Sequence, residues 1–402
     1  MPASTSIHVS ARVNAFSYAI RNIVAEAKKV EAAGRAVRYL NIGDPIQFGF
    51  KTPPHLIEAV ERAMRDGQNG YVPSAGIEPA RVAVAEEYAR RGMAVPADRV
   101  VVTQGTSEGI ELALSVLADP GDEVLVPTPT YPLYTAVLAK IGARAVYYRT
   151  DPARGWQPDL DDIRRRTTSA TRAMVVIDPN NPTGAVYPEA TRRALIDFAD
   201  RAGLTILADE VYGDVAFDGP APLLGSLAPQ APIISFSSLS KAYLAPGWRT
   251  GWLVVSDCRR LDDVLAGVRK MADGRLCSPG PMQYAIAPAL NGDRSHQAQF
   301  ARALHERAQL TTTRLTAIPG VSCVMPRAAF YAMPKVDLPS GKTDQDYVLE
   351  LLRATGILCV YGSGFGMPTD EGYFRIVFLA SPGELNGIYD DMATFTRGFL
   401  GR

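Results

Sequence analysis

Cysteine is scarce in this chain, which has only four cysteines among its 402 residues. They lie at positions 258, 277, 323 and 359, a spacing that matches neither a zinc knuckle nor the framework of a disulfide-rich domain. We therefore expect reduced thiols that are mostly buried. His305-Glu306 and the acidic cluster at 159–162 also lack the spacing of metal ligands, so no metal is predicted.

Charge of one sign and long hydrophobic runs are lacking as well. The 42 basic and 42 acidic side chains cancel, which leaves no basic field for nucleic acid. No apolar run approaches the roughly 20 residues that cross a bilayer, and no signal peptide follows Met1, so no membrane partner is expected. We expect a cytoplasmic enzyme that acts on small molecules. At about 150 residues per domain, its length predicts two or three domains, or a large domain with a smaller companion.

Short apolar runs alternate with helical patterns in the middle of the chain. Pro, Gly, Asp or Ser bound the candidate strands, which lie at 100–103, 123–126, 173–177, 204–208, 233–236 and 252–255. Between two of them, residues 188–202 place apolar side chains on one helical face, and Gly203 is a typical C-terminal cap. This alternation predicts an α/β fold with a mostly parallel sheet covered by helices on both faces.

The pattern changes after about residue 300. Strands are expected near 321–325, 357–361 and 373–378, and helices near 344–354 and from about Pro382 onward. This order predicts a smaller α+β domain. The chain is therefore divided into an N-terminal arm and helix packing on the small domain (1–45), a large domain (46–300) and a small C-terminal domain (301–402).

Polar residues follow several of the predicted strands, where ligands of open α/β sheets bind. Gly105, Thr106 and Ser107 follow the first strand and open a helix, which offers free N–H groups, two hydroxyls and a helix dipole to an anion. Phosphate would suit this turn. A serine that simply caps the helix is the more common interpretation of such a turn taken alone.

Two further strand ends carry groups that need partners. Asp209 follows a buried strand, with Tyr212 three residues on, and a carboxylate held there requires a cation or several hydrogen bonds unless solvent reaches it. Lys241 lies among four serines after another strand. A lone lysine is normally solvated, but small hydroxyl and aromatic neighbours favour a neutral amine that attacks carbonyl groups.

Three motifs together resemble the class I/II aminotransferases, which are pyridoxal-phosphate enzymes of fold type I. They are Asn-Asn-Pro-Thr-Gly at 180–184, Asp-Glu-Val-Tyr at 209–212, and Ser238-x-x-Lys241 with Arg249 eight residues later. The resemblance extends from about residue 40 to 375. It implies a large domain with a mostly parallel, seven-stranded-type sheet, and a small α+β domain built from the C-terminal part and the N-terminal segment.

The resemblance implies a role for each matching residue toward pyridoxal 5′-phosphate. Lys241 is similar to the lysine that forms the Schiff base and moves the proton between Cα and C4′. Asp209 is similar to the aspartate that pairs with the ring nitrogen. Asn181 and Tyr212 match the donors to the phenolic oxygen. Tyr131 matches the aromatic residue that stacks on the ring, and a core tyrosine is the less favoured alternative at that position.

The same resemblance implies the phosphate and substrate contacts. The groups that match the phosphate site are Gly105, Thr106, Ser107, Ser238 and Arg249. Tyr71 resembles the tyrosine that reaches the phosphate of the other subunit, which implies a homodimer with shared active sites. Arg375 is similar to the arginine that binds the α-carboxylate of the substrate, and Gly43 and Asn181 match positions beside it.

Two N-terminal segments narrow the resemblance to the glutamate-pyruvate (alanine) aminotransferases rather than the aspartate enzymes. They are Tyr18-Ala-Ile-Arg21 and the run from Gly43 to Phe50. Tyr18 and Arg21 would line the side-chain pocket, with Arg21 on the distal carboxylate of glutamate, although a structural salt bridge is an equal alternative for Arg21. The predicted reaction is a ping-pong transfer of an amino group between L-alanine or L-glutamate and a 2-oxo acid such as pyruvate or 2-oxoglutarate.

Three alternatives stay open at this point. Another amino donor, such as aspartate or an aromatic or branched-chain amino acid, would use the same machinery. A pyridoxal-phosphate lyase or decarboxylase would keep Lys241, Asp209 and Arg375. A ligand-sensing regulator would need an attached DNA-binding module, and only a short helix is expected before residue 40.

The segment from Gly362 to Gly366 looks like part of a dinucleotide fingerprint. Met367-Pro368 follows it instead of an opening helix, so we interpret the segment as a loop.

Overall fold

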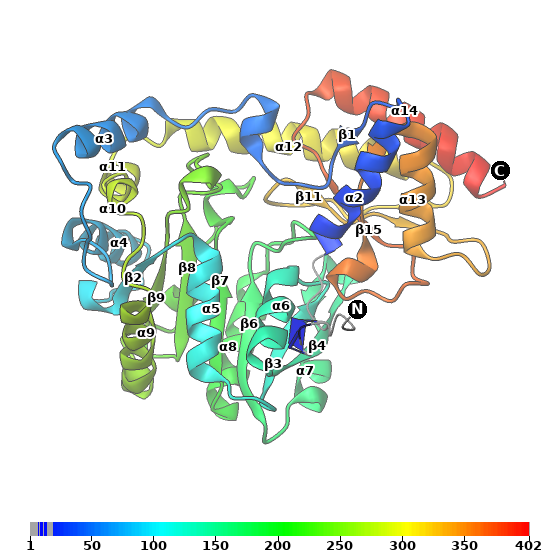
Figure 1. Ribbon diagram of the computed structural model, residues 1–402. Coiled ribbons are helices and arrows are strands. Elements are labelled where there is room, and N and C mark those ends of the chain that lie inside the picture. Colours follow the sequence, from blue (N-terminus) through cyan, green and yellow to red (C-terminus); the bar gives the residue numbers. More distant parts are fainter. Residues whose placement is uncertain (1–6, 8, 11, 14–18, 402) are drawn as a thin grey trace, which may run out of the picture.

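The computed structural model describes residues 7, 9–10, 12–13 and 19–401, and its largest element is an eight-stranded sheet (Figure 1). The strand order is β2-β9-β8-β7-β6-β3-β4-β5. In chain order the strands are β2 (Val100–Thr103), β3 (Glu123–Thr128), β4 (Arg144–Asp151), β5 (Gln157–Pro158), β6 (Thr171–Ile177), β7 (Thr205–Asp209), β8 (Ile233–Ser238) and β9 (Gly251–Val255). All six strands predicted for the middle of the chain are present.

The sheet is mostly parallel, as predicted. Strands β8, β7, β6, β3 and β4 run parallel to one another, whereas β9 runs antiparallel to both of its neighbours, β8 and β2. The eighth strand, β5, is a two-residue edge strand paired antiparallel with β4. Since β2 and β8 both run antiparallel to β9, their carboxyl ends lie at the same edge of the sheet as those of β3, β6 and β7.

The sheet is buried on both faces because its strands are apolar at successive positions. Ile206 and Ala208 of β7 pack into one hydrophobic cluster, whereas Leu207 between them packs into the other. The first cluster includes side chains of α4 (Glu78–Arg90) and α8 (Glu189–Ala202). The second includes side chains of α5 (Thr106–Leu117), α6 (Pro132–Ile141) and α9 (Asp262–Gly274). The predicted helical cover on both faces is therefore confirmed.

A smaller set of strands and helices lies beside the large sheet (Figure 1). Strands β11 (Tyr331–Ala332), β15 (Phe374–Val377) and β14 (Val360–Tyr361) form one sheet, and β10 (Val321–Ser322) pairs with β12 (Lys335–Val336). The N-terminal β1 (Arg38–Tyr39) pairs in parallel with β13 (Ile357–Leu358). The remaining helices are α2 (Ala19–Ala32), α3 (Pro54–Arg65), α7 (Leu160–Arg166), α10 (Gly280–Gln283), α11 (Ile286–Asn291), α12 (Ser295–Thr316), α13 (Asp344–Thr355) and α14 (Pro382–Phe399).

Helix α12 connects the two parts of the molecule and runs across the top of Figure 1. It begins before residue 300 and continues beyond it, so the division of the chain at residues 45 and 300 stays a prediction. Within the described part of the chain, no helix is both long and apolar enough to cross a membrane.

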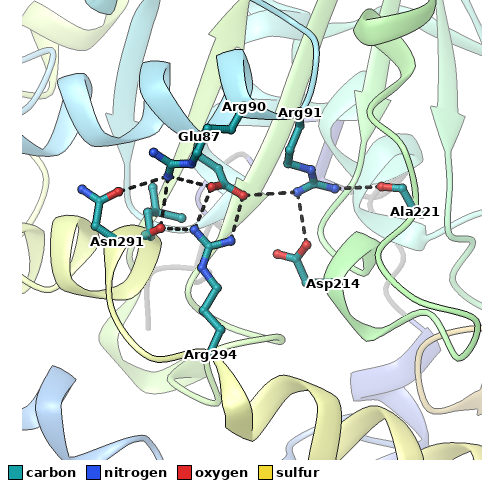
Figure 2. A network of polar contacts seen from close by, with 8 residues as sticks. Glu87, Arg90, Arg91, Asp214, Ala221, Asn291 and Arg294 are labelled. Atoms are coloured by element: carbon teal, nitrogen blue, oxygen red, sulfur yellow. Dashed lines mark hydrogen bonds and ion pairs between the residues drawn. The ribbon is translucent and has the colours of Figure 1, made fainter.

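A buried carboxylate fixes the start of α12 to the large domain (Figure 2). Arg294, which precedes the helix, donates to both oxygens of Glu87 on α4, at 2.9 and 2.7 Å. Arg90 also donates to Glu87, and Arg91 links the group to Asp214 at 3.1 Å. Burial alone would raise the pKa of Glu87, but the hydrogen bonds from Arg294 and Arg90 outweigh it and hold the pKa below its usual value. Glu87 is therefore an ionised anchor for the helix that carries the chain into the small domain.

Candidate active site

A cavity of about 810 Å³ lies at the carboxyl ends of the strands and is closed on its far side by the small domain. Eleven residues singled out from the sequence line it. They are Gly43, Thr106, Ser107, Tyr131, Asn181, Asp209, Tyr212, Ser238, Lys241, Arg249 and Arg375. The structure thus brings together residues that are separated by as many as 332 positions in the sequence, from Gly43 to Arg375, and most of them follow parallel strands that end at one edge.

Strand register explains how three separate segments meet at one end of the cavity. Gly251 of β9 pairs with Thr103 of β2 on one side and with Ser238 of β8 on the other. A Cβ atom on Gly251 would lie 2.8 Å from the backbone nitrogen of Thr106. A glycine at position 251 therefore lets the turn after β2 pack directly against β9, the neighbour of the strand that carries Ser238.

The turn after β2 has the features of an anion site. Gly105, with φ of 72°, is the N-cap of α5, and no side chain caps the helix, so the interpretation of Ser107 as a simple cap is wrong. The Oγ1 atom of Thr106 is buried and has no hydrogen-bond partner among the described residues. A Cβ on Gly105 would lie 2.5 Å from Nη2 of Arg249, which therefore rests directly against the turn. Free helix N–H groups, hydroxyls and a guanidinium converge here.

Lys241 follows β8 and reaches across the cavity toward the N-terminal segment. Its Nζ donates to the backbone oxygen of Gly43 at 3.0 Å. Burial, together with the charges of Arg375 and Arg249, lowers the pKa of this amine from its usual 10.5 to about 8, and Asp44 opposes the shift. More of this amine is thus neutral near neutral pH than for an ordinary lysine, and the neutral form is the one that acts as a nucleophile or general base.

Asp209 ends β7 and is fully enclosed beneath the cavity. Its carboxylate accepts hydrogen bonds from the hydroxyl of Tyr134 at 3.1 Å and from the backbone N–H of Val211 at 3.4 Å. Burial nevertheless raises the pKa of Asp209 to about 6. A cationic group in the cavity would lower this pKa again, so the site is suited to a ligand with a protonated nitrogen.

Arg375 on β15 is the main contribution of the small domain. Its guanidinium carbon lies 4.6 Å from the ring centre of Tyr331 and 4.8 Å from that of Phe365, so the planar group lies against two aromatic rings. One nitrogen donates to Oδ1 of Asn181 at 3.2 Å, and another donates to the backbone oxygen of Asn41. This fixed, buried fork has the geometry that proteins use to bind a carboxylate.

The turn that carries Asn181 is held by polar contacts on both sides. Asp178 forms a buried ion pair with Arg192 of α8, with an N–O distance of 2.6 Å. Asn180 accepts hydrogen bonds from the backbone and hydroxyl of Thr183. Of the two adjacent asparagines, Asn180 thus stabilises the turn and Asn181 faces the cavity.

Three sequence-predicted residues lie elsewhere or are not described. Tyr71 is 84% exposed and does not line the cavity described above. It lies in a separate surface pocket of about 500 Å³ formed with Gly70 and residues 277–281. Tyr18 lies outside the described residues, and Arg21 belongs to α2 but its side chain is also outside the described part.

Two tyrosines of the site were missed by sequence reasoning. Tyr134 lies one helical turn after Tyr131, a spacing that could have revealed it. Tyr331 lies on a two-residue strand, and it belongs neither to a periodic pattern nor to any of the three family motifs. Its hydroxyl lies 2.9 Å from that of Tyr212. No group of three or more His, Cys, Asp or Glu side chains that could hold a metal occurs among the residues that the structure covers.

Comparisons with known proteins agree with this geometry. The family described as aminotransferase class I and II matches residues 37–386. The chain is 37% identical to glutamate-pyruvate aminotransferase AlaA of Escherichia coli strain K12, over 98% of each chain. Among solved structures, alanine aminotransferase from Pyrococcus furiosus matches with a TM-score of 0.94 and 37% identity, covering 97% of this chain and 100% of that one. Aspartate aminotransferase from Thermus thermophilus with maleate matches with a TM-score of 0.87 and 30% identity, covering 97% and 100%.

Proposed function

The chain belongs to the class I and II aminotransferases, and on this basis we propose that it transfers an amino group between L-alanine or L-glutamate and a 2-oxo acid. Pyruvate and 2-oxoglutarate are the corresponding oxo acids. The observation that carries the proposal is that Lys241, Asp209 and Arg375 line one cavity, although they come from three separate segments. Homologues named for alanine or glutamate-pyruvate transfer, at 37% identity over nearly the whole chain, support these substrates.

The cavity fits pyridoxal 5′-phosphate at both ends of that molecule. The buried, unpartnered hydroxyl of Thr106 and the adjacent guanidinium of Arg249 would hold the phosphate, together with Gly105, Ser107 and Ser238. Asp209 would pair with the ring nitrogen, and this pairing would offset the burial that raises the pKa of its carboxyl group. Tyr131 would cover the ring, and Asn181 and Tyr212 would donate to its phenolic oxygen.

When bound, pyridoxal phosphate supplies an aldehyde that condenses with amines and a ring that accepts the electrons of the broken Cα–H bond. Lys241 would hold the aldehyde between turnovers. Once released by the substrate amine, its neutral Nζ would take the proton from Cα and return it to the neighbouring carbon of the cofactor. The lowered pKa of about 8 suits Lys241 to carry that proton in both directions.

Arg375 would orient the substrate through its α-carboxylate. The two flanking rings restrict the guanidinium to one plane, so that a bound carboxylate is held in a single orientation. Asn181 and the backbone at Gly43 lie on the same side of the cavity. Binding at this point would place Cα within reach of Lys241.

The described cavity lining is suited to a small side chain. It includes the apolar Ile42 and Leu133, and its cations among the described residues are Lys241, Arg249 and Arg375, which all have roles above. The distal carboxylate of glutamate would therefore need a further cation, and we propose that Arg21, with Tyr18 beside it, serves that purpose. The lower identity to the aspartate enzyme, 30% against 37%, also favours the alanine and glutamate specificity.

We also propose that the active unit is a homodimer. Tyr71 is exposed and lines a separate surface pocket instead of its own cavity, as expected of a residue that completes the site of a second subunit. The four unpaired thiols favour a reducing compartment, so we propose a location in the cytoplasm.

Absorbance spectra of the purified enzyme test this proposal. L-alanine, L-glutamate and L-aspartate are added separately, without an oxo acid. We expect alanine and glutamate, but not aspartate, to replace the band of the lysine-bound cofactor by that of the aminated cofactor. The Lys241→Ala variant should not complete this change. A band that persists with all three would exclude these donors, and product formed without aminated cofactor would identify a lyase.

A further inference from the structure

Tyr331 contacts both the cofactor side and the substrate side of the cavity. Its hydroxyl lies 2.9 Å from the hydroxyl of Tyr212. The face of its ring lies 4.6 Å from the guanidinium carbon of Arg375. Tyr331 is only 3% exposed, so both contacts are shielded from solvent.

The position of Tyr331 is fixed by its backbone on both sides. It pairs with Val377 in the antiparallel β11–β15 ladder. On the other side, the backbone N–H groups of Arg327 and Ala328 donate to the oxygen of Gly184, at 2.8 and 3.0 Å. A Cβ atom on Gly184 would lie 3.0 Å from the carbonyl oxygen of Tyr331, so a glycine at this turn lets the segment that carries Tyr331 approach the large domain closely.

The N-terminal segment closes over the same hydroxyl. A Cβ on Gly43 would overlap the Tyr331 hydroxyl and ring, and the backbone oxygen of Gly43 accepts the hydrogen bond from Lys241. Tyr331 is thus packed at the point where the large domain, the small domain and the N-terminal segment meet.

The direction of the hydrogen bond between the hydroxyls of Tyr212 and Tyr331 determines which group Tyr212 can donate to. A tyrosine hydroxyl has one hydrogen, so in the pair formed by Tyr212 and Tyr331 only one can donate to the other. If Tyr212 donated to Tyr331, it could not also donate to a group in the cavity. Burial, together with the adjacent Tyr331, raises the pKa of Tyr212 well above its usual value, so the Tyr212 proton is retained.

We propose that Tyr331 is a positioning residue that donates to Tyr212, directs the single proton of Tyr212 into the cavity, and holds the plane of Arg375 with its ring. This inference rests on the proposed function, because the acceptor in the cavity would be the phenolic oxygen of pyridoxal phosphate. The hydroxyl would then act on the cofactor through Tyr212, whereas the ring would act on the substrate through Arg375.

The hydroxyl is tested by titrating the absorbance of the bound cofactor. A hydrogen bond donated to the phenolic oxygen makes that oxygen a weaker acceptor for the proton on the neighbouring Lys241 nitrogen, so this proton is lost at a lower pH. Losing the donor therefore raises the pH midpoint of the absorbance change. We expect Tyr331→Phe to raise it by about half a pH unit, the effect of weakening one hydrogen bond. The other ionisable groups facing this pair are Tyr131, Asp209, Lys241 and Arg375.

A double-mutant comparison shows whether Tyr331 acts through Tyr212. In the Tyr212→Phe background, adding Tyr331→Phe should shift the midpoint no further. An equal shift in both backgrounds, or no shift in the single variant, would overturn the proposed hydrogen-bond direction. These outcomes differ from failure of the proposed function, in which the unmodified enzyme would show no bound-cofactor spectrum to titrate.

The proposed role of the Tyr331 ring is tested by measuring KM and kcat separately for two variants. Tyr331→Phe keeps the ring and should leave KM for the amino acid within about twofold, whereas Tyr331→Leu should raise KM about tenfold through loss of the Arg375 contact. Equal KM values for the Leu variant and the unmodified enzyme would contradict the role of the ring. Circular dichroism establishes that each variant is folded. If Tyr331→Leu does not fold, Tyr331→Met takes its place.

Discussion

Arg375 of the small domain donates a hydrogen bond to Asn181 of the large domain at a distance of 3.2 Å. The arginine lies on β15, and the asparagine lies on the turn that follows β6. This contact joins the residue proposed to bind the substrate carboxylate to a residue proposed to bind the cofactor ring. If both proposals hold, the relative position of the two domains determines whether substrate and cofactor can meet.

Replacing Arg375 by lysine tests the carboxylate role. Arg375→Lys keeps the positive charge but loses the planar fork, so we expect kcat/KM for L-alanine to fall by about 10- to 100-fold, mainly through KM. Steady-state kinetics measure the effect. Arg353→Lys is a matched control on the same domain because Arg353 is 60% exposed. Unchanged kinetics in Arg375→Lys would assign carboxylate binding to another residue.

Asp209 and Asp178 are buried aspartates at the ends of neighbouring strands, and replacing each one distinguishes an effect on catalysis from an effect on stability. Asp209→Asn removes the charge beneath the cavity and should lower kcat about 100-fold with little loss of stability. Asp178→Asn instead breaks the buried pair with Arg192 and should reduce the free energy of unfolding by about 3 kcal/mol, with a much smaller loss of kcat than in Asp209→Asn. Denaturant unfolding and kcat are measured for both. A similar loss of kcat in the two variants would argue against a specific role for Asp209.

The lowered pKa of Lys241 predicts a pH dependence for cofactor attachment. Only the neutral amine reacts with an aldehyde, and burial disfavours the charged form, so the neutral fraction increases as pH rises through about 8. The rate at which apoenzyme incorporates pyridoxal phosphate should therefore level off above pH 8. Free Nα-acetyl-lysine serves as the reference, and its rate should continue to rise toward about pH 10. Identical profiles would show that the site does not activate Lys241.

Mixed dimers test whether Tyr71 serves the other subunit. Each heterodimer of Tyr71→Ala and Lys241→Ala chains, purified through two different tags, should contain one intact site and have about half the native activity. The intact site would combine Lys241 of one chain with Tyr71 of the other. If Tyr71 acts within its own subunit, heterodimer activity will not exceed half that of the Tyr71→Ala homodimer.

Much of the large domain could be predicted because its central strands are buried on both faces. β6 contains the continuous apolar run from Ala173 to Ile177 and β7 the run from Ile206 to Ala208, and each run is followed by a polar residue or turn that can be recognised in the sequence. Strand β4 was missed because only part of it is buried and Arg149 interrupts its apolar pattern. The short strands β11 and β12 have no sequence pattern of their own, since pairing with distant segments creates them.

The candidate site could be predicted where a motif encodes it locally. Lys241, Asp209 and Asn181 each lie in a short motif after a strand. Tyr331 could not be found in this way, because its importance depends on contacts with Tyr212 and Arg375 that only the tertiary fold creates. The roles of Tyr18 and Arg21 stay predictions.

The most direct test of the proposed reaction follows the amino nitrogen itself. The enzyme is incubated with ¹⁵N-labelled L-alanine, 2-oxoglutarate and pyridoxal phosphate, and the products are identified by NMR. We predict that the label appears in glutamate, with one pyruvate formed for each glutamate, and that the Lys241→Ala variant transfers none. Label released as ammonium, or retained in alanine, would contradict an alanine–glutamate aminotransferase.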